Sequence, residues 1–307
     1  MRTPRDLEST LPSPSEMDDY HKCPCYWYLR DRMWIKPIGE RWPLTFGKIV
    51  DDTCGIWLAK GIIEADKLIK YYWEEVARIE PSYEDDYFTT YAASTKDALT
   101  AWLEKYGKIA HEEEIIAIQP KIKSNVNIKI DYVVRGKTGL RVRERKLMTG
   151  WNDIEEEMQK YEMGFQPICY HEKAAEFFEE KIECVEMEFL IRSVPASGRY
   201  KEKPAMAERR ELFIDDWKRD LWYNSALFTN ECMKMLDASL AGETESVTFA
   251  SIPRHTRNCL QKIGKKIYPC EFYTCCQTNT SPLKITDRFT CDRKEATDAL
   301  SRHSEGN

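Results

Sequence analysis

The first third of the chain has the apolar spacing of amphipathic helices. After a polar, Pro-containing lead-in (1–12) that we expect to be disordered, SPSE offers a helix cap. From Gly47, apolar residues recur every three or four positions in KIVDDTCGIWLAKG, which predicts a helix. The same spacing continues over 62–80 and 84–107, and Pro81 separates these two helices.

The pattern changes near residue 112. EEEIIAIQPKIKSNVNIKIDYVVRGKTGLRVRERKLM is rich in Ile and Val and contains the turn signal RGKTG. It predicts three strands, the last two joined as a hairpin. A helix at about 153–179 and the strand CVEMEFLIRSV are expected next. A polar loop, PASGRYKEKPAMAERR, then leads to a long helix at about 211–240 and a cysteine-bearing tail of coil and short helix.

This order of elements predicts the α/β class, with a mixed sheet flanked by helices and a helical insert. We expect a single domain over 13–276. Its parts are a helical region, a core, and a helical and cysteine-rich region, at 53–111, 112–192 and 205–276. Residues 277–307 form a polar tail, expected to be disordered after Cys291.

Composition and charge narrow the class of protein. Of 307 residues, 42% are hydrophobic and 32% are charged, and the formal net charge is −6. A chain that gripped duplex DNA with its whole surface would usually be basic, so a nucleic-acid role must use a local patch. Apolar runs are too short for a membrane span, and the N-terminus lacks the apolar segment of a secretory signal. We therefore expect a cytoplasmic protein without membrane association.

Eleven cysteines are many for an intracellular chain. Disulfides are a poor explanation in a reducing compartment, so clustered cysteines indicate a metal or cluster site. Cys54, Cys169, Cys184 and Cys232 occur singly in apolar surroundings and fit small buried hydrophobic side chains. The groups HKCPCYWYL and RNCLQKIGKKIYPCEFYTCC fit that explanation less well.

The strand in GLRVRERKLMTGW carries charges where a buried strand should carry apolar side chains. Pairing across a turn at 136–139 sets Asp131 level with residues 144–146, and strand alternation points Glu144 and Lys146 to one face and Arg145 to the other. Two carboxylates bind Mg²⁺ or Mn²⁺, and a nearby lysine can orient the metal-bound water or offset charge on a phosphate. A cross-strand salt bridge on a solvated face is the open alternative.

Asp131 followed by Glu144-x-Lys146 on a hairpin resembles the PD-(D/E)XK nuclease superfamily, which has a restriction-endonuclease-like core. On the following helix, Gln166 and Tyr170 share one face and resemble the Gln-x-x-x-Tyr motif of RecB-like nucleases.

An upstream motif extends this resemblance. LTFGKIVDD resembles the family's early Gly-x-x-x-His helix, but Asp51 stands where the family has the metal-binding His. Aspartate is a competent ligand for a hard metal ion, and Asp52 is the second candidate at this place.

The two cysteine groups resemble the split site of iron–sulfur RecB-like nucleases, which include the AddB nuclease domain and CRISPR adaptation nucleases. There, one cysteine from the start of the domain and three from its end bind a [4Fe–4S] cluster. The resemblance implies the ligands Cys23, Cys259, Cys270 and Cys276, with Cys25 and Cys275 as possible substitutes. A four-cysteine Zn²⁺ site has the same ligand count and is the alternative.

Basic residues occur in three stretches that suit a single-stranded backbone with stacked bases. GLRVRERK supplies Arg141, Arg143 and Arg145 beside the predicted metal site, and IRSVPASGRYKEK and QKIGKKIY supply others near Tyr200 and Tyr268. A solvated charged face explains each single stretch equally well.

The resemblance spans about 13–276 and implies a metal-dependent DNA nuclease with a structural [4Fe–4S] cluster. In this interpretation Asp131, Glu144 and Asp51 bind Mg²⁺ or Mn²⁺, and Lys146 positions the attacking water or stabilises the phosphate. The nearby Gln166 and Tyr170 organise the scissile strand or the lysine.

The implied substrate is DNA that is single-stranded or has ends, cut exonucleolytically in a prokaryotic or phage setting, with a helicase or recombination protein as a conceivable partner. Two alternatives stay open. One is a catalytically weak or inactive DNA-binding subunit of the same fold, which Asp51 favours. The other is an RNA-directed or structure-specific endonuclease.

Overall fold

The computed structural model of the chain describes residues 11–32, 35–37, 42–59, 65–79, 86–107, 113–123, 126–150, 153–162, 164–194, 202–240, 260–263, 266–270, 272, 276 and 289–291. The chain divides into two compact units. One comprises Met1–Gly39 with Asp220–Asn307, and the other comprises Glu40–Arg219. The predicted single domain over 13–276 draws on both units and stays a prediction.

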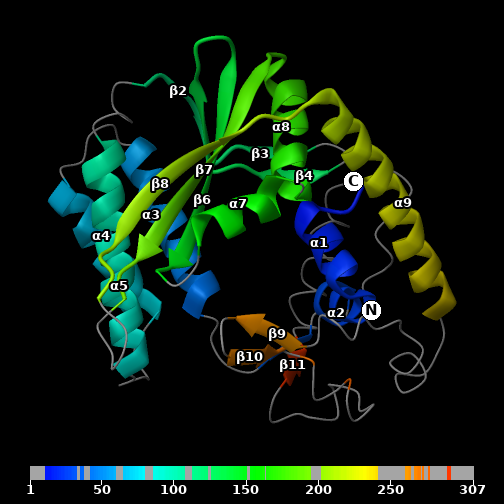
Figure 1. The fold of residues 1–307 in the computed structure, drawn as a ribbon, viewed down its shortest axis with the longest axis horizontal. Coiled ribbons are helices and arrows are strands. Elements are labelled where there is room, and N and C mark those ends of the chain that lie inside the picture. Colours follow the sequence, from blue (N-terminus) through cyan, green and yellow to red (C-terminus); the bar gives the residue numbers. More distant parts are fainter. Residues whose placement is uncertain are drawn as a thin grey trace, which may run out of the picture. The chain divides into compact units, whose positions relative to one another are not determined.

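A five-stranded mixed sheet forms the centre of the Glu40–Arg219 unit (Figure 1). Its strands, in spatial order, are β2 (Ile115–Ile118), β5 (Tyr132–Arg135), β6 (Leu140–Thr149), β7 (Ile182–Arg192) and β8 (Met206–Leu212). Strands β6 and β7 run parallel, and the other neighbours are antiparallel. The predicted α/β class, a mixed sheet flanked by helices, is confirmed.

Helices cover the sheet on both faces. The predicted early helices are present as α3 (Trp42–Ala59), α4 (Ala65–Ile79) and α5 (Asp86–Trp102), and the last continues as a π-helical turn, Leu103–Gly107. Their aromatic core includes Phe46, Trp57, Tyr72 and Trp102, and it packs against Tyr132 and Leu190 of the sheet. None of the helices in the described ranges is long and apolar enough to cross a membrane.

Two helices connect β6 to β7, as a parallel pair of strands requires. The single helix predicted at 153–179 is instead two helices, α7 (Ile154–Glu162) and α8 (Phe165–Phe178), and Gly164 is the N-cap of α8. The second helix, α8, contacts β6 and β7.

The hairpin predicted from RGKTG is confirmed as β5–β6. The Gly136 N–H donates to the Gly139 carbonyl, and Tyr132 pairs with Arg143, so Asp131 is level with Glu144 as expected. Gly139 is required by close approach, because a Cβ there would lie 2.3 Å from the Lys181 carbonyl oxygen.

The stretch predicted as three strands contains five, because β3 (Lys121–Lys123) and β4 (Asn127–Lys129) form a separate two-stranded sheet. The chain leaves β2 at Gln119 and Pro120 and returns to β5 through Asp131. Proline has no N–H for a strand ladder, which explains the break.

The predicted boundary between a polar loop and a helix at about residue 211 is wrong, because residues 206–212 form β8. The helix α9 begins later and spans Asp216–Leu240. The sequence pattern did not predict this strand, because its inward-facing positions include Arg209, which pairs with the buried Glu188 on β7. Buried ion pairs remove the apolar alternation by which strands are recognised.

The other unit contains the terminal segments. Ser13 and Glu16 form a capping box that begins α1 (Pro14–Lys22), as SPSE predicted. The cysteine-bearing tail was predicted as coil and short helix, and this is wrong for its described strands. The strands of the tail are β9 (Leu260–Ile263), β10 (Lys266–Pro269) and β11 (Phe289–Cys291). After α1, the N-terminal segment continues with α2 (Pro24–Trp27), a π-helical turn (Tyr28–Arg32) and β1 (Ile35–Pro37). The disorder predicted for 1–12 is wrong at Leu11 and Pro12, which are described and buried. The remaining residues predicted to be disordered, 1–10 and 292–307, lie outside the described residues.

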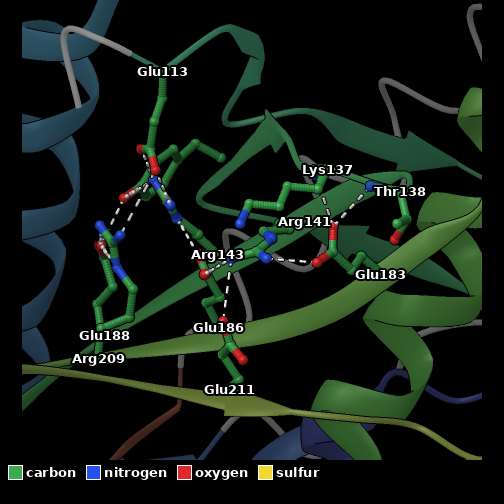
Figure 2. A network of polar contacts seen from close by, with 11 residues as sticks. Glu113, Lys137, Thr138, Arg141, Arg143, Glu183, Glu186, Glu188, Arg209 and Glu211 are labelled. Atoms are coloured by element: carbon green, nitrogen blue, oxygen red, sulfur yellow. Dashed lines mark hydrogen bonds and ion pairs between the residues drawn. The ribbon is translucent and has the colours of Figure 1, made fainter. Parts of the chain in front are cut away.

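One sheet face carries a buried network of ion pairs (Figure 2). Arg143 on β6 is only 1% exposed; it donates to Glu186 on β7 and to both carboxylate oxygens of Glu113. Arg141 pairs with Glu183, Glu186 and Glu211 at its solvent side. The parallel register of β6 and β7 places Arg143 directly opposite Glu186, so the backbone pairing itself brings the two charges together.

Glu188 is the centre of the innermost part of this network. It accepts hydrogen bonds from Tyr132 (2.7 Å), Arg209 (2.6 Å) and Trp102 (3.3 Å), and the Arg145 guanidinium lies 3.3 Å away. Although burial alone raises the pKa of the Glu188 carboxyl, the neighbouring arginines hold this pKa below its usual value. The carboxylate therefore stays ionised inside the fold.

This network corrects one prediction. Arg143 and Arg145 were expected among the contacts to nucleic acid, but both are buried and pair with glutamates of the same sheet. Of the other two basic stretches, residues 195–201 of IRSVPASGRYKEK lie outside the described residues, whereas the backbone of QKIGKKIY is described as strands except at residues 264–265.

We expect Arg143→Met to lower the free energy of unfolding by about 3–5 kcal/mol, because it leaves buried carboxylates without their countercharge. Urea denaturation measures this. Arg135→Met is the matched control on β5; Arg135 is 38% exposed and pairs with Glu114 and Glu180, so its loss should cost less than about 1 kcal/mol. Equal losses for the two variants would show that the buried network does not stabilise the sheet.

Candidate metal centre

Four predicted site residues meet on the sheet face opposite the ion-pair network. Strand alternation points Glu144 and Lys146 toward α8, which carries Gln166 and Tyr170 on one face. The Lys146 Nζ donates to Glu144 Oε1 (2.6 Å) and Gln166 Oε1 (3.1 Å). The Gln166 Nε2 donates to Glu144 Oε1 (2.9 Å) and the Tyr170 hydroxyl (2.9 Å). A strand and a helix thus hold one connected set.

The alternative of a salt bridge on a solvated face does not describe Glu144, which is 6% exposed. Its Oε1 atom receives both contacts from Lys146 and Gln166, whereas its buried Oε2 atom has no hydrogen-bond donor among the described residues. An unpaired buried carboxylate oxygen is costly, and a bound cation would remove that cost. The oxygen therefore fits a metal ligand.

Asp131 and Asp51 bring two further carboxylates to this place. Asp131 is buried at the start of β5, and its Oδ2 accepts the Arg145 backbone N–H (2.7 Å). Asp51 comes from α3, at the position that the resemblance marks as a metal ligand. Burial raises the pKa of Asp51 well above its usual range, and the charges of Asp131 and Glu144 raise it further, against Arg145 and Lys146.

The same repulsion acts on Glu144, because burial and the Asp131 charge raise its pKa to about 7 although Lys146 opposes them. The buried Asp131 and Glu144 and the partly buried Asp51 form a carboxylate donor set in which the pKa values of Asp51 and Glu144 are raised, and a divalent cation would stabilise it. The residues present therefore fit Mg²⁺ or Mn²⁺, and Asp131, Glu144 and Asp51 are the groups that would hold it.

A tighter acidic group exists elsewhere in the described part of the chain. Cys184, Glu186 and Glu211 each place one ligand atom within 4.8 Å of the others, whereas Asp51, Asp131 and Glu144 are not grouped so closely. Arg141 and Arg143 already neutralise Glu186 and Glu211. Magnesium usually keeps several waters and needs only one or two carboxylates, so the wider spacing still suits it.

Gln119 connects the two aspartates and was missed by the sequence reasoning. Its backbone N–H donates to the Asp131 carbonyl (2.8 Å), and its side-chain Nε2 donates to the Asp51 carbonyl (3.1 Å). It adopts a left-handed conformation (φ 48°), which is unusual for a residue with a side chain. A Cβ on Gly55 would lie 2.9 Å from this Nε2, so glycine leaves room for the contact. The sequence signal that could have indicated this irregular position is Pro120, which interrupts the strand pattern directly after Gln119.

Arg145 was predicted to face away from Glu144, and it does, but its role differs from the expected contact with nucleic acid. Its guanidinium stacks on Tyr132 (4.5 Å) and Trp102 (5.3 Å) beside Glu188. Its backbone holds Asp131, so one residue links the ion-pair network to a candidate ligand. The alternating glutamates of ECVEMEFL were the signal that could have indicated partners for these arginines.

Lys146 and Tyr170 keep their protons in this environment. Burial alone lowers the pKa of Lys146, but Glu144 and Tyr161 outweigh it and hold this pKa above its usual value. Burial, followed by the Glu144 charge, raises the pKa of Tyr170. Lys146 is therefore a fixed ammonium beside the carboxylates, suited to donate to an anion.

Three of the four predicted cluster ligands occur together in the unit of terminal segments. Cys23, Cys270 and Cys276 pack with Tyr26 and Phe272 in one hydrophobic cluster. Burial raises the pKa of the Cys270 thiol, and Cys276 and Cys23 are near enough to raise it as well, against the Phe272 backbone and Lys22. Cys25 lies in the same cluster, whereas Cys259 and Cys275 lie outside the described residues.

Local sequence places Cys23 at this cluster. It is both the C-cap of α1 and the N-cap of α2, and Pro24 begins α2 as proline commonly does at the first helical position. At the other end of the chain, the Cys276 N–H donates to the Phe272 carbonyl (3.0 Å), and the Phe272 ring contacts Tyr26.

Comparison with protein-family models gives no match, and no curated protein matches the sequence. Among solved structures, the crystal structure of a "Putative exonuclease" from Eubacterium rectale matches 90% of this chain and 91% of that chain, at 12% sequence identity and a TM-score of 0.46. Such a likeness assigns no residue role, so function must be argued from the chemistry of the site.

We expect Mn²⁺ to stabilise the protein through Glu144. A ligand that binds only the folded state at about 100 times its Kd adds about 2.7 kcal/mol to the free energy of unfolding. Urea denaturation with and without Mn²⁺ should show this gain for the unmodified chain and its loss in Glu144→Gln.

Glu211→Gln is the matched control, since it alters the tighter acidic group instead. It should keep the Mn²⁺ gain. Loss of the gain in Glu211→Gln and its survival in Glu144→Gln would place the metal at the other group.

Proposed function

We propose that this chain is a metal-dependent nuclease that hydrolyses phosphodiester bonds in DNA. The observation that supports this most is the buried Glu144 carboxylate, with one oxygen held by Lys146 and Gln166 and the other without a donor in the described part of the chain. Asp131 and Asp51 add carboxylates at the same place. Glu186 and Glu188 in the ion-pair network differ from Glu144, because both carboxylate oxygens of each accept a hydrogen bond.

The roles of the side chains follow from their charge and contacts. A bound Mg²⁺ or Mn²⁺ would lower the pKa of a coordinated water and offset phosphate charge. Lys146, which keeps its proton, donates to a phosphate oxygen and stabilises negative charge that develops in the transition state. Gln166 holds the ammonium in place, and the Tyr170 hydroxyl accepts from Gln166 and so fixes its amide.

Substrate form and mode of attack are the finer part of the proposal. Single-stranded or end-containing DNA, cut exonucleolytically, is what the resemblance to RecB-like nucleases implies. A helicase or recombination partner is proposed from the same resemblance. These points rest on motif order, not on a geometric feature of the site.

A catalytically weak or inactive DNA-binding subunit of the same fold is the second candidate. Two observations favour it: Asp51 replaces the histidine of the family pattern, and the three carboxylates are not tightly grouped. Metal binding together with an absence of cleavage would distinguish this candidate from the first.

We also propose that the cysteine cluster binds a [4Fe–4S] cluster, with Zn²⁺ as the alternative. The support is that the buried Cys23 and the partly buried Cys270 and Cys276, from segments far apart in the chain, pack in one apolar cluster of side chains. Its role is structural, since a link between residue 23 and residues 270–276 closes a very long loop.

End-labelled single-stranded DNA should be degraded by anaerobically purified protein with Mn²⁺, and not with EDTA. Lys146→Ala should lower the rate by about 10²–10³, the usual effect of removing one group that stabilises transition-state charge. Gel analysis of product length over time measures both.

Lys105→Ala is the control for the loss of an ordinary lysine, because within the described part of the chain the Lys105 ammonium contacts a backbone carbonyl and a tyrosine ring of the same unit. It should keep the activity. Equal rates for Lys146→Ala and the unmodified protein would reject the proposed site, and resistance of a circular single strand would support exonucleolytic attack.

Iron and acid-labile sulfide should be found in stoichiometric amount in protein purified without oxygen. Cys23→Ser and Cys270→Ser should lose them, because each removes one of the thiolates that such a cluster requires. Cys169→Ser, a buried cysteine of α8, should retain them. Zinc in place of iron in the unmodified protein would establish the alternative.

A further inference from the structure

The two-stranded sheet β3–β4 has one buried face and one cationic face. Ile122, Val126 and Ile128 are buried, whereas Lys121 and Lys129, which alternate with the isoleucines, are exposed. In the antiparallel register Lys121 is directly opposite Lys129. Alternation therefore anchors the hairpin by its apolar side and presents two ammonium groups on the other.

This pairing is unfavourable in the isolated protein, because like charges directly opposite on a sheet destabilise it. Among the described residues, the Lys129 Nζ lies 3.9 Å from the Asp52 Oδ1, and both side chains are roughly two-fifths exposed. Such a pair contributes little. The chain has a net charge of −6, so basic composition does not explain two facing lysines. A polyanion bound across the hairpin would relieve the repulsion.

The hairpin is continuous with the candidate metal centre. Lys129 precedes Asp131 by two residues, which places their Cα atoms about 7 Å apart in extended chain. At the other strand, Gln119 and Pro120 lead into Lys121, and the Gln119 N–H donates to the Asp131 carbonyl. The separation of Lys129 and Asp131 is comparable to that between neighbouring phosphates of an extended single strand.

Helix α3 adds a third lysine. Lys48 is exposed and precedes Asp51 and Asp52 by one helical turn, so it shares their side of α3. The Lys129–Asp52 contact joins this side of α3 to the hairpin. Exposed ammonium groups thus border the carboxylates on two elements.

We propose that the solvent face of β3–β4, through Lys121 and Lys129, binds the phosphate backbone of the DNA strand that enters the metal centre. The inference rests on the proposed nuclease function and names the surface that holds its substrate. Lysine contacts phosphate as a point charge and does not read bases, so this surface binds DNA without sequence preference.

The test is the binding of a fluorescently labelled oligothymidine to the full chain in EDTA, which prevents cleavage, over a series of salt concentrations. Each phosphate contact in a single strand contributes about 0.7 to the slope of log K against log salt. The double variant Lys121→Gln/Lys129→Gln should lose about 1.4 of that slope and bind roughly tenfold more weakly at low salt.

Lys67→Gln/Lys70→Gln on α4 is the matched control, because it removes the same charge from another exposed surface of the same unit. It should keep the slope of the unmodified protein. The hairpin variant should unfold at an equal or higher urea concentration, since it removes a repulsive pair, and this excludes misfolding as the cause of weaker binding.

Failure of this inference and failure of the nuclease proposal give different results. If the chain cleaves DNA while the hairpin variant binds with unchanged affinity and slope, the hairpin assignment is overturned and the nuclease stands. If the variant loses affinity and slope but no metal supports cleavage, the hairpin assignment stands for a DNA-binding subunit. Loss of affinity for an oligouridine alone would overturn the assignment to DNA.

Discussion

The pairing of alternate arginines on β6 with glutamates on β7 is the constraint on which the sheet and the candidate site depend. Arg143 meets Glu186 and Arg145 meets Glu188 because the parallel register sets each pair opposite. Buried charges of this kind tolerate no shift of register, since a slip by one residue would move every charge to the other face. The position of Glu144 and Lys146, which alternate with these arginines, is thereby specified as well.

The two faces of β6 differ in their balance of charge: arginines surround the glutamates on one face, and carboxylates are in excess on the other. On the network face, Arg143, Arg145 and Arg209 lower the pKa of Glu188, which remains ionised inside the fold. On the other face, Asp51, Asp131 and Glu144 outnumber Lys146, and the pKa values of Asp51 and Glu144 rise. Such an excess of carboxylates over cations suits a site for an external cation. Arg145 belongs to both faces, through its guanidinium and its backbone N–H.

The cysteine cluster and the hairpin lysines extend the same argument to other parts of the chain. Cysteines from distant segments pack in one apolar cluster, and two lysines face each other beside the carboxylates. A bound group would stabilise each arrangement: iron and sulfide or zinc in one case, phosphate in the other. Features that break a local rule without compensation within the fold commonly mark functional sites.

Local chemistry in the sequence determined the α1 capping box, the β5–β6 hairpin and the alignment of Asp131 with Glu144. These depend on side chains a few residues apart, on the turn signal and on the two-residue period of a strand. The four-residue spacing of Gln166 and Tyr170 likewise determined their common helical face. Only the tertiary structure decided that Arg143 and Arg145 lie inside, that residues 206–212 form a strand, and that Gln119 joins Asp51 to Asp131. The reason is that a charged residue is read as exposed until its partner is known, and here each partner comes from a different strand or helix.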